Sequence, residues 1–158
     1  MKRLYLFVLA PVLLPLAVCF AAQAQRPSDV VKWSATITGA TSTTASATLS
    51  ATIQDGWHVY ALSQPSGGPT PLRINIPSGG SFTLAGPVAE TKVIRHFDPN
   101  FNMETVYYLT VASFNLELKG TGSAAIESIP IDVRFQACSD RLCLPPFTAH
   151  VTAERKRR

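Results

Sequence analysis

Two cysteines near the C-terminal end, Cys138 and Cys143, are separated by four residues. An apolar, strand-like run from Ile129 to Phe135 enters this segment, and a double proline follows it. Four residues are an ordinary loop length for a β-hairpin, and facing positions on antiparallel strands bring α-carbons close enough for a disulfide. The spacing therefore allows a bridge across a hairpin, which could be a structural staple or a working redox pair.

The residues alone leave these two interpretations open. As a staple the bridge would be weak, because closing so small a ring is worth only about 2 kcal/mol in the loop-entropy model. Asp140 and Arg141 keep the loop tip polar, and no helix N-terminus or neighbouring histidine in the sequence activates either thiol. Such a pair suits a site that waits for attack by the thiolate of a partner.

Other reactive side chains are scattered along the sequence. Structural zinc sites usually contain two close pairs of ligands, and here only the cysteines form one, so His58, His96 and His150 are read as polar strand or loop residues. The carboxylates at Asp55, Asp98, Glu104 and Asp132 accompany no serine in a nucleophile-elbow motif. We therefore expect no metal site, no cofactor and no hydrolytic site.

Short runs of β-branched and aromatic residues, separated by turn signals, must position the cysteines. Strands are expected at about residues 30–38, 43–53, 57–60, 72–76, 82–85, 91–96, 105–118 (as one bent strand or two), 124–137 and 147–152. No segment shows capped helical periodicity over ten or more residues. This pattern predicts an all-β fold, an antiparallel β-sandwich.

Residues 1–24 predict a secretory signal peptide, with a charged start, an apolar stretch and the small-x-small pattern Ala22-Gln23-Ala24. Pro11 and Pro15 argue against a membrane-spanning helix. Leu16 to Cys19 approximates a lipoprotein cleavage box, but the bulky Val18 disfavours lipidation at Cys19. We expect cleavage near Ala24 and a periplasmic or secreted protein, in a compartment where disulfides persist.

The remainder is long enough for one domain, which we place at residues 25–153. The net charge of +4 depends on the chain ends, because residues 25–154 contain eight Lys/Arg against ten Asp/Glu. Residues 154–158 form a basic C-terminal tail, read as a solvated end, with contact to an anionic membrane surface as the alternative. Because no positive cluster is expected on a folded face, we expect no nucleic-acid binding. We also expect the protein to be a monomer.

Three segments together resemble a known family. The segment from Val133 to Cys138, followed by Cys143-Leu144-Pro145-Pro146, resembles the active-site hairpin of the N-terminal periplasmic domain of the DsbD thiol–disulfide transporter family. Gly56-Trp57-His58-Val59-Tyr60 resembles a strand of that domain, and Asp98 to Glu104 resembles the segment that carries its cap loop. The resemblance covers nearly all of the mature chain in the same order.

The resemblance implies an immunoglobulin-like sandwich in which Cys138 and Cys143 shuttle between dithiol and disulfide. It further implies an aromatic cap that shields the disulfide. Phe101 is the first candidate for the cap and Phe97 the alternative, although plain core packing would also explain either ring. Asp98 and Tyr60 would be pocket residues.

By the same resemblance, electrons reach this domain from a membrane-embedded transporter through a thioredoxin-like domain. They then pass to periplasmic disulfide isomerases or cytochrome c maturation proteins. The chain would be a thiol–disulfide oxidoreductase module of the protein-disulfide reductase type, and a Cys143→Ser variant is expected to trap a mixed disulfide through Cys138.

Two departures from the family bear on this reading. Its best-known members have five residues between the cysteines, and this sequence has neither their transmembrane bundle nor their thioredoxin domain, so the donor is expected to be a separate chain. The alternative function is a non-enzymatic β-sandwich binding module with a purely structural disulfide, using the loop from Ser63 to Pro71 for contact.

Overall fold

β-Strands account for most of the computed structural model, which describes residues 25–120 and 127–155. The expected signal peptide, Cys19, most of the turn after Gly120 and the last three residues of the basic tail lie outside the described residues. The described part of the chain contains no helix with the length and apolar character needed to cross a bilayer.

One short helix, α1 (Pro27–Val30), precedes the first strand. The strands are β1 (Val31–Ala40), β2 (Thr44–Ile53), β3 (His58–Tyr60), β4 (Arg73–Asn75), β5 (Phe82–Leu84), β6 (Ala89–Glu90), β7 (Ile94–Asp98), β8 (Met103–Tyr108), β9 (Val111–Gly120), β10 (Ser128–Phe135), β11 (Ala137–Cys138) and β12 (Phe147–Arg155). The run from Thr105 to Leu118, expected as one bent strand or two, is two strands. The chain turns between them at Thr110, whose φ of 58° lies in the left-handed region.

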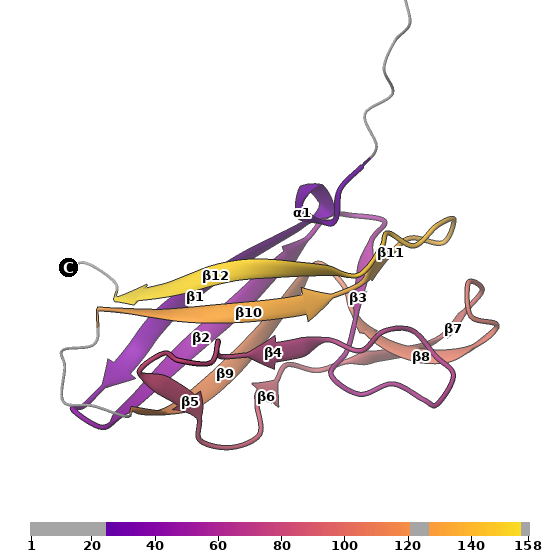
Figure 1. The fold of residues 1–158 in the computed structure, drawn as a ribbon. Helices are drawn as coiled ribbons and strands as arrows, with labels where there is room; N and C mark the ends of the chain where they lie inside the picture. The colour runs from indigo at the N-terminus through magenta and orange to yellow at the C-terminus, as the bar shows by residue number, and fades with distance from the viewer. Residues whose placement is uncertain (1–24, 121–126, 156–158) are drawn as a thin grey trace, which may run out of the picture.

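The strands form two sheets (Figure 1). The larger sheet has the order β4-β10-β12-β1-β2-β9-β5, with β6 also pairing with β9, and the smaller has the order β11-β3-β8-β7. The expected all-β, immunoglobulin-like sandwich is confirmed.

One strand pair departs from the expected antiparallel arrangement, because β1 and β12 are parallel from Ala35–Ala153 to Ile37–Arg155. This pairing joins the first and last strands of the domain. β12 runs through Arg155, three residues beyond the end of the last strand expected from the sequence, at about residue 152.

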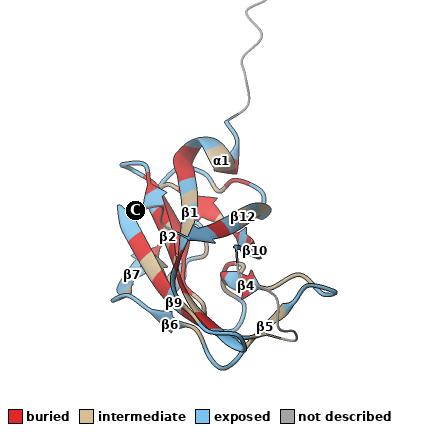
Figure 2. Cartoon of the chain, turned by 90° about the vertical axis from the view of Figure 1, so that its left-hand side faces the viewer, coloured by how far each residue is buried: buried red, intermediate tan, exposed pale blue. Residues whose placement is uncertain are grey.

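Alternating side chains build the core, as expected for strands buried on one face. Buried residues recur at every second position along much of β2, β9 and β10. In Figure 2 the buried residues follow the strands of the sandwich, whereas the connecting loops are mostly exposed. The largest fully buried side chains on β9 and β10 are Phe114, Leu116, Leu118, Ile129, Ile131 and Phe135.

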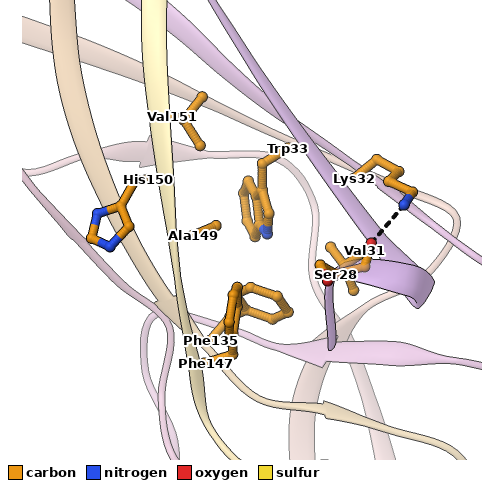
Figure 3. Close-up of a pocket in the computed structure, with 9 residues that line it drawn as sticks. All are labelled: Ser28, Val31, Lys32, Trp33, Phe135, Phe147, Ala149, His150 and Val151. Carbon is orange, nitrogen blue, oxygen red and sulfur yellow. Dashed lines mark hydrogen bonds between the residues drawn. The ribbon is translucent and has the colours of Figure 1, made fainter. Parts of the chain in front are cut away.

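The indole of Trp33, on β1, packs against two aromatic rings of the core. The Trp33 ring lies 6.0 Å from the ring of Phe114 and 5.5 Å from that of Phe135. Beside it lies a cavity of about 270 Å³, lined by Ser28, Val31, Lys32, Trp33, Phe135, Phe147, Ala149, His150 and Val151 (Figure 3). The rings of Phe135 and Phe147 are 6.1 Å apart, and the segment between these two residues carries the cysteines. The core therefore holds the Phe135 end of that segment, and the ring of Phe147, which is 39% exposed, packs against it.

Candidate functional site

The cysteines lie on a short hairpin that leaves the larger sheet and joins the smaller one. β11 pairs with β3, so that Ala137 faces Val59 and Cys138 faces His58. The chain then turns, and Cys143 returns opposite Cys138. The two residues form a disulfide with α-carbons 4.0 Å apart.

Backbone and side-chain hydrogen bonds hold this hairpin in one shape. Ser139 N donates to Leu142 O at 2.9 Å, and Leu144 N donates to Ala137 O at 2.9 Å. The Gln136 side chain anchors the base, since its Oε1 accepts from Thr70 N at 3.2 Å. The bridge is thus presented by a tight turn on a packed base.

The two cysteines differ in exposure. Cys138 is fully buried, whereas Cys143 is partly exposed. Cys143 is thus the more exposed of the two residues in the oxidised hairpin, whereas the expected mixed disulfide through Cys138 stays a prediction. Sequence spacing could not show this difference, because it depends on which side of the hairpin packs on the smaller sheet.

A buried tyrosine and a buried carboxylate lie beside the bridge. Tyr60 Oη is 3.9 Å from Cys143 Sγ and donates a hydrogen bond to Asp98 Oδ2 at 2.5 Å. Asp98 is 2% exposed and also accepts from Thr105 Oγ1 at 3.4 Å and from Asn100 N at 2.9 Å. Burial raises the pKa of Tyr60, and its hydrogen bond to Asp98 raises this pKa further.

Opposing effects act on the carboxyl group of Asp98. Burial by itself would raise its pKa, but hydrogen bonds from Tyr60 and Asn100 and the proximity of His58 outweigh this, so that the pKa is lowered. Asp98 is therefore held as a carboxylate at neutral pH, next to the sulfur-contacting tyrosine.

The loop between β7 and β8 covers this cluster from the other side. Asn100 Nδ2 donates to Ser139 O at 3.0 Å, which ties the loop to the cysteine hairpin. Phe101 is partly buried, with its ring edge-to-face with Tyr60 at 5.7 Å. Phe97, in contrast, is 55% exposed on β7. The structure thus brings together Cys138, Cys143, Tyr60, Asp98 and Phe101, and leaves Phe97 at the surface.

His58 was missed as part of this cluster. It is 8% exposed, with Nε2 3.8 Å from Asp98 Oδ2 and its ring 5.0 Å from Tyr60 and 4.5 Å from Tyr107. Burial lowers the pKa of His58, while Asp98 and Asp140 act in the opposite direction. The alternation His58-x-Tyr60 places both side chains on one face of a strand and was the available signal.

The remaining histidines are exposed at the surface. His96 lies on β7, and His150 Nδ1 is 2.7 Å from Asp132 Oδ1. Within residues 25–120 and 127–155, no three or more His, Cys, Asp or Glu side chains are grouped to hold a metal ion.

Replacing Asp98 by asparagine is expected to weaken the acid sensitivity of the fold. Because its folded-state pKa is lowered, Asp98 contributes stability that is present above the unfolded pKa of about 3.9 and is lost as pH falls through the folded pKa. Urea unfolding measured at about pH 5 and at about pH 3 gives the free energy of unfolding at each pH. The decrease between the two should be smaller for Asp98→Asn than for the natural chain. Glu104→Gln, at an exposed carboxylate, is the control, and equal losses in all three proteins would contradict the prediction.

Two solved structures share the fold. The N-terminal periplasmic domain of ScsB from Proteus mirabilis aligns with a TM-score of 0.59 and 17% identity, over 83% of this chain and 49% of that one. The N-terminal domain of DsbD from Neisseria meningitidis, in the reduced form, aligns with a TM-score of 0.51 and 14% identity, over 82% of this chain and 89% of that one. The chain therefore spans about half the length of the ScsB structure.

The structure is thus a β-sandwich that carries a disulfide on a short hairpin. The family model described as "Thiol:disulfide interchange protein DsbD, N-terminal" matches residues 21–155. The chain belongs to this family, which confirms the resemblance seen in the three segments. No curated protein sequence matches the chain.

Proposed function

We propose that this chain is a periplasmic module that relays reducing equivalents through Cys138 and Cys143. The donor is a thioredoxin-like domain on a separate chain, and the acceptors are periplasmic proteins with disulfides. The observation that carries this proposal is a disulfide on a short hairpin with one partly exposed cysteine, next to Tyr60 and Asp98. The predicted signal peptide, and the periplasmic location stated for the related ScsB domain, support the compartment.

The exposure of the cysteines suggests the order of bond changes. A donor thiolate attacks Cys143 Sγ, a mixed disulfide forms, and Cys138 leaves as a thiolate with the electron pair of the broken bond. The second donor thiolate then attacks the donor sulfur of the mixed disulfide and releases the Cys143 thiolate. The Cys138 and Cys143 thiolates take up the two protons that the donor thiols released on ionising, so two electrons and two protons have moved from the donor dithiol to this chain, and the reverse sequence reduces an acceptor.

The decisive experiment asks whether the bridge opens in the folded protein. A mild dithiol should reduce Cys138–Cys143 reversibly, as followed by thiol trapping, while the far-ultraviolet circular dichroism stays unchanged. Reduction should not need unfolding, because the bridge closes only a short hairpin at one end of the sandwich. A bridge that resists until denaturant is added would be a staple, and the relay would be excluded.

Mixed-disulfide trapping identifies the attacked cysteine. A Cys138→Ser variant keeps the more accessible Cys143 and should accumulate a mixed disulfide with a thioredoxin-like protein, as seen on non-reducing gels. The Cys143→Ser variant is the matched control and should trap less. Preferential trapping by Cys143→Ser would show that Cys138 is attacked first.

Removing the Phe101 ring is expected to expose the bridge to small thiols. Aromatic contacts like the one between Phe101 and Tyr60 are worth about 0.5–1.5 kcal/mol, so opening of the loop should become about two- to tenfold easier in Phe101→Ala. The rate of reduction by glutathione should rise by that factor. Phe97→Ala removes an exposed ring from β7, just before the loop that carries Phe101, and should leave the rate unchanged. A larger effect of Phe97→Ala than of Phe101→Ala would make Phe97 the cap.

A further inference from the structure

A buried imidazole nitrogen in the site has no hydrogen-bond partner. His58 Nε2 is shielded from solvent and makes no hydrogen bond in the described structure. It lies 3.8 Å from Asp98 Oδ2, so a shift of about 1 Å would create a hydrogen bond. An unpartnered buried nitrogen costs free energy, and such a group in a reactive site needs an explanation.

His58 ends a line of polar groups that begins at the sulfur. Cys143 Sγ is 3.9 Å from Tyr60 Oη, Tyr60 Oη is 2.5 Å from Asp98 Oδ2, and Asp98 Oδ2 is 3.8 Å from His58 Nε2. Each of these steps can carry a proton after a small movement. The line comes from three segments, since β3 supplies two of its members, β7 supplies Asp98 and the hairpin supplies Cys143.

Titratable groups from four elements of the structure surround His58. Its own strand contributes Tyr60, β8 contributes Tyr107 and β7 contributes Asp98. The cysteine hairpin contributes the charge of Asp140 and, in the reduced protein, the thiol of Cys138, whose residue is paired with His58 between β11 and β3. Burial is the larger effect and lowers the pKa of His58, and both carboxylates partly offset it by stabilising an imidazolium.

We propose that His58 is the terminal proton acceptor when the reduced site attacks an acceptor disulfide, and that it works through Asp98 and Tyr60. This inference rests on the proposed relay function and concerns its second half, in which the chain donates electrons. His58 touches neither sulfur in this proposal; it activates the thiol of Cys143 through the two residues between them.

The step balances as follows. The Cys143 S–H proton moves to Tyr60 Oη, the Tyr60 proton moves to Asp98, and a proton moves from Asp98 to His58 Nε2, leaving a Cys143 thiolate and an imidazolium. The thiolate attacks the acceptor disulfide and forms a mixed disulfide, and one acceptor sulfur leaves with the electron pair and takes a proton. The Cys138 thiol then loses its proton to water, and its thiolate attacks Cys143 Sγ, so that the bridge is restored and the second acceptor sulfur leaves with the electron pair and takes a proton from water. The imidazolium gives up its proton in the same exchange, and the two protons lost by Cys143 and Cys138 equal the two gained by the acceptor sulfurs.

Intrinsic acidities show why the line must end at a histidine. An ordinary thiol has a pKa of about 8.5, an ordinary carboxyl group about 3.9 and a tyrosine about 10, so neither Asp98 nor Tyr60 can keep a thiol proton near neutral pH. An imidazole, with an ordinary pKa of about 6.5, is a stronger base than a carboxylate and is neutral near pH 7, so it can hold the thiol proton for the moment of attack. The lowered pKa of His58 keeps the ring unprotonated and ready at pH 7.

The experiment measures the reaction of the reduced, folded protein with oxidised glutathione from about pH 4 to about pH 9. The natural chain should show an inflection below about pH 6.5 in addition to that of the attacking thiol, because protonated His58 cannot accept a proton. His58→Gln and Tyr60→Phe should both lose this inflection. His58→Gln should react about 10²-fold more slowly near pH 7, the lower end of the usual contribution of a positioned base. His96→Gln, at an exposed histidine of β7, should match the natural chain.

The outcomes separate this inference from the proposed function. If the natural chain cannot be reduced while folded, or does not react when reduced, the relay itself fails. If it reacts and His58→Gln keeps both the inflection and the rate, the relay stands and the role of His58 is overturned.

A second measurement needs no variant. Imidazole signals in nuclear magnetic resonance should give His58 a higher pKa in the reduced protein than in the oxidised one, because a thiolate forms nearby. An unchanged pKa would also overturn the inference.

Discussion

A variant in which alanine replaces both Cys138 and Cys143 is expected to lose thiol–disulfide exchange completely and yet remain folded. No other cysteine lies in residues 25–158, so no sulfur is left to accept the electrons. The bridge closes a short ring, and its loss should lower the free energy of unfolding by only about 2 kcal/mol. Domains of this kind usually retain about 5–15 kcal/mol, so the sandwich should survive.

This double variant also tests the binding-module alternative. Exchange is measured by the transfer of reducing equivalents to a disulfide-containing protein, and stability by urea unfolding, with the oxidised natural chain as reference. Retained transfer would exclude the cysteines as the redox pair. If the natural chain transfers no reducing equivalents and the double variant binds its partner as tightly as the natural chain does, the binding-module alternative is favoured.

Replacing Phe114 by alanine is expected to lower the free energy of unfolding by about 3–5 kcal/mol. The Phe114 ring is fully buried on β9 and packs against Trp33 at 6.0 Å and edge-to-face against Tyr108 at 5.4 Å. Strands on both sides of this ring are fixed by their sheet pairing, so the cavity can collapse only in part. Urea unfolding measures this decrease in the free energy of unfolding, provided that its dependence on urea concentration is the same for the variant and the natural chain.

The matched control for Phe114 is Phe97→Ala, which removes the same ring from an exposed position and should cost no more than about 0.5 kcal/mol. Similar losses for both variants would mean that the core does not depend on Phe114.

Local patterns predicted most of the strands because strand burial alternates with the sequence. The run from Ile129 to Phe135 alternates apolar and other residues, and β10 occupies that run. The division between β8 and β9 was left open, because the turn at Leu109-Thr110 contains neither glycine nor proline. The parallel pairing of β1 with β12 joins residues more than a hundred positions apart, which no local pattern records.

The site shows the same division between local and long-range information. The disulfide follows from the spacing of Cys138 and Cys143 within one hairpin. The position of His58 does not, because it depends on the pairing of β3 with β11 across some eighty residues. A search for activating groups that was confined to the neighbouring sequence therefore overlooked the histidine facing Cys138.

The course of β12, from the cysteine hairpin to the far end of the sandwich, determines where a fusion partner can be attached. β12 begins at Phe147, beside the cysteine hairpin, and runs for nine residues to Arg155, a distance of about 30 Å at the usual rise of a strand. In Figure 1 the arrowhead of β12 lies at the opposite end of the molecule from β11, whereas α1 lies toward the hairpin end. A fusion partner or immobilising tether attached after Arg155 would therefore leave the sulfurs open to visiting proteins, whereas the same cargo placed ahead of Pro27 would crowd them.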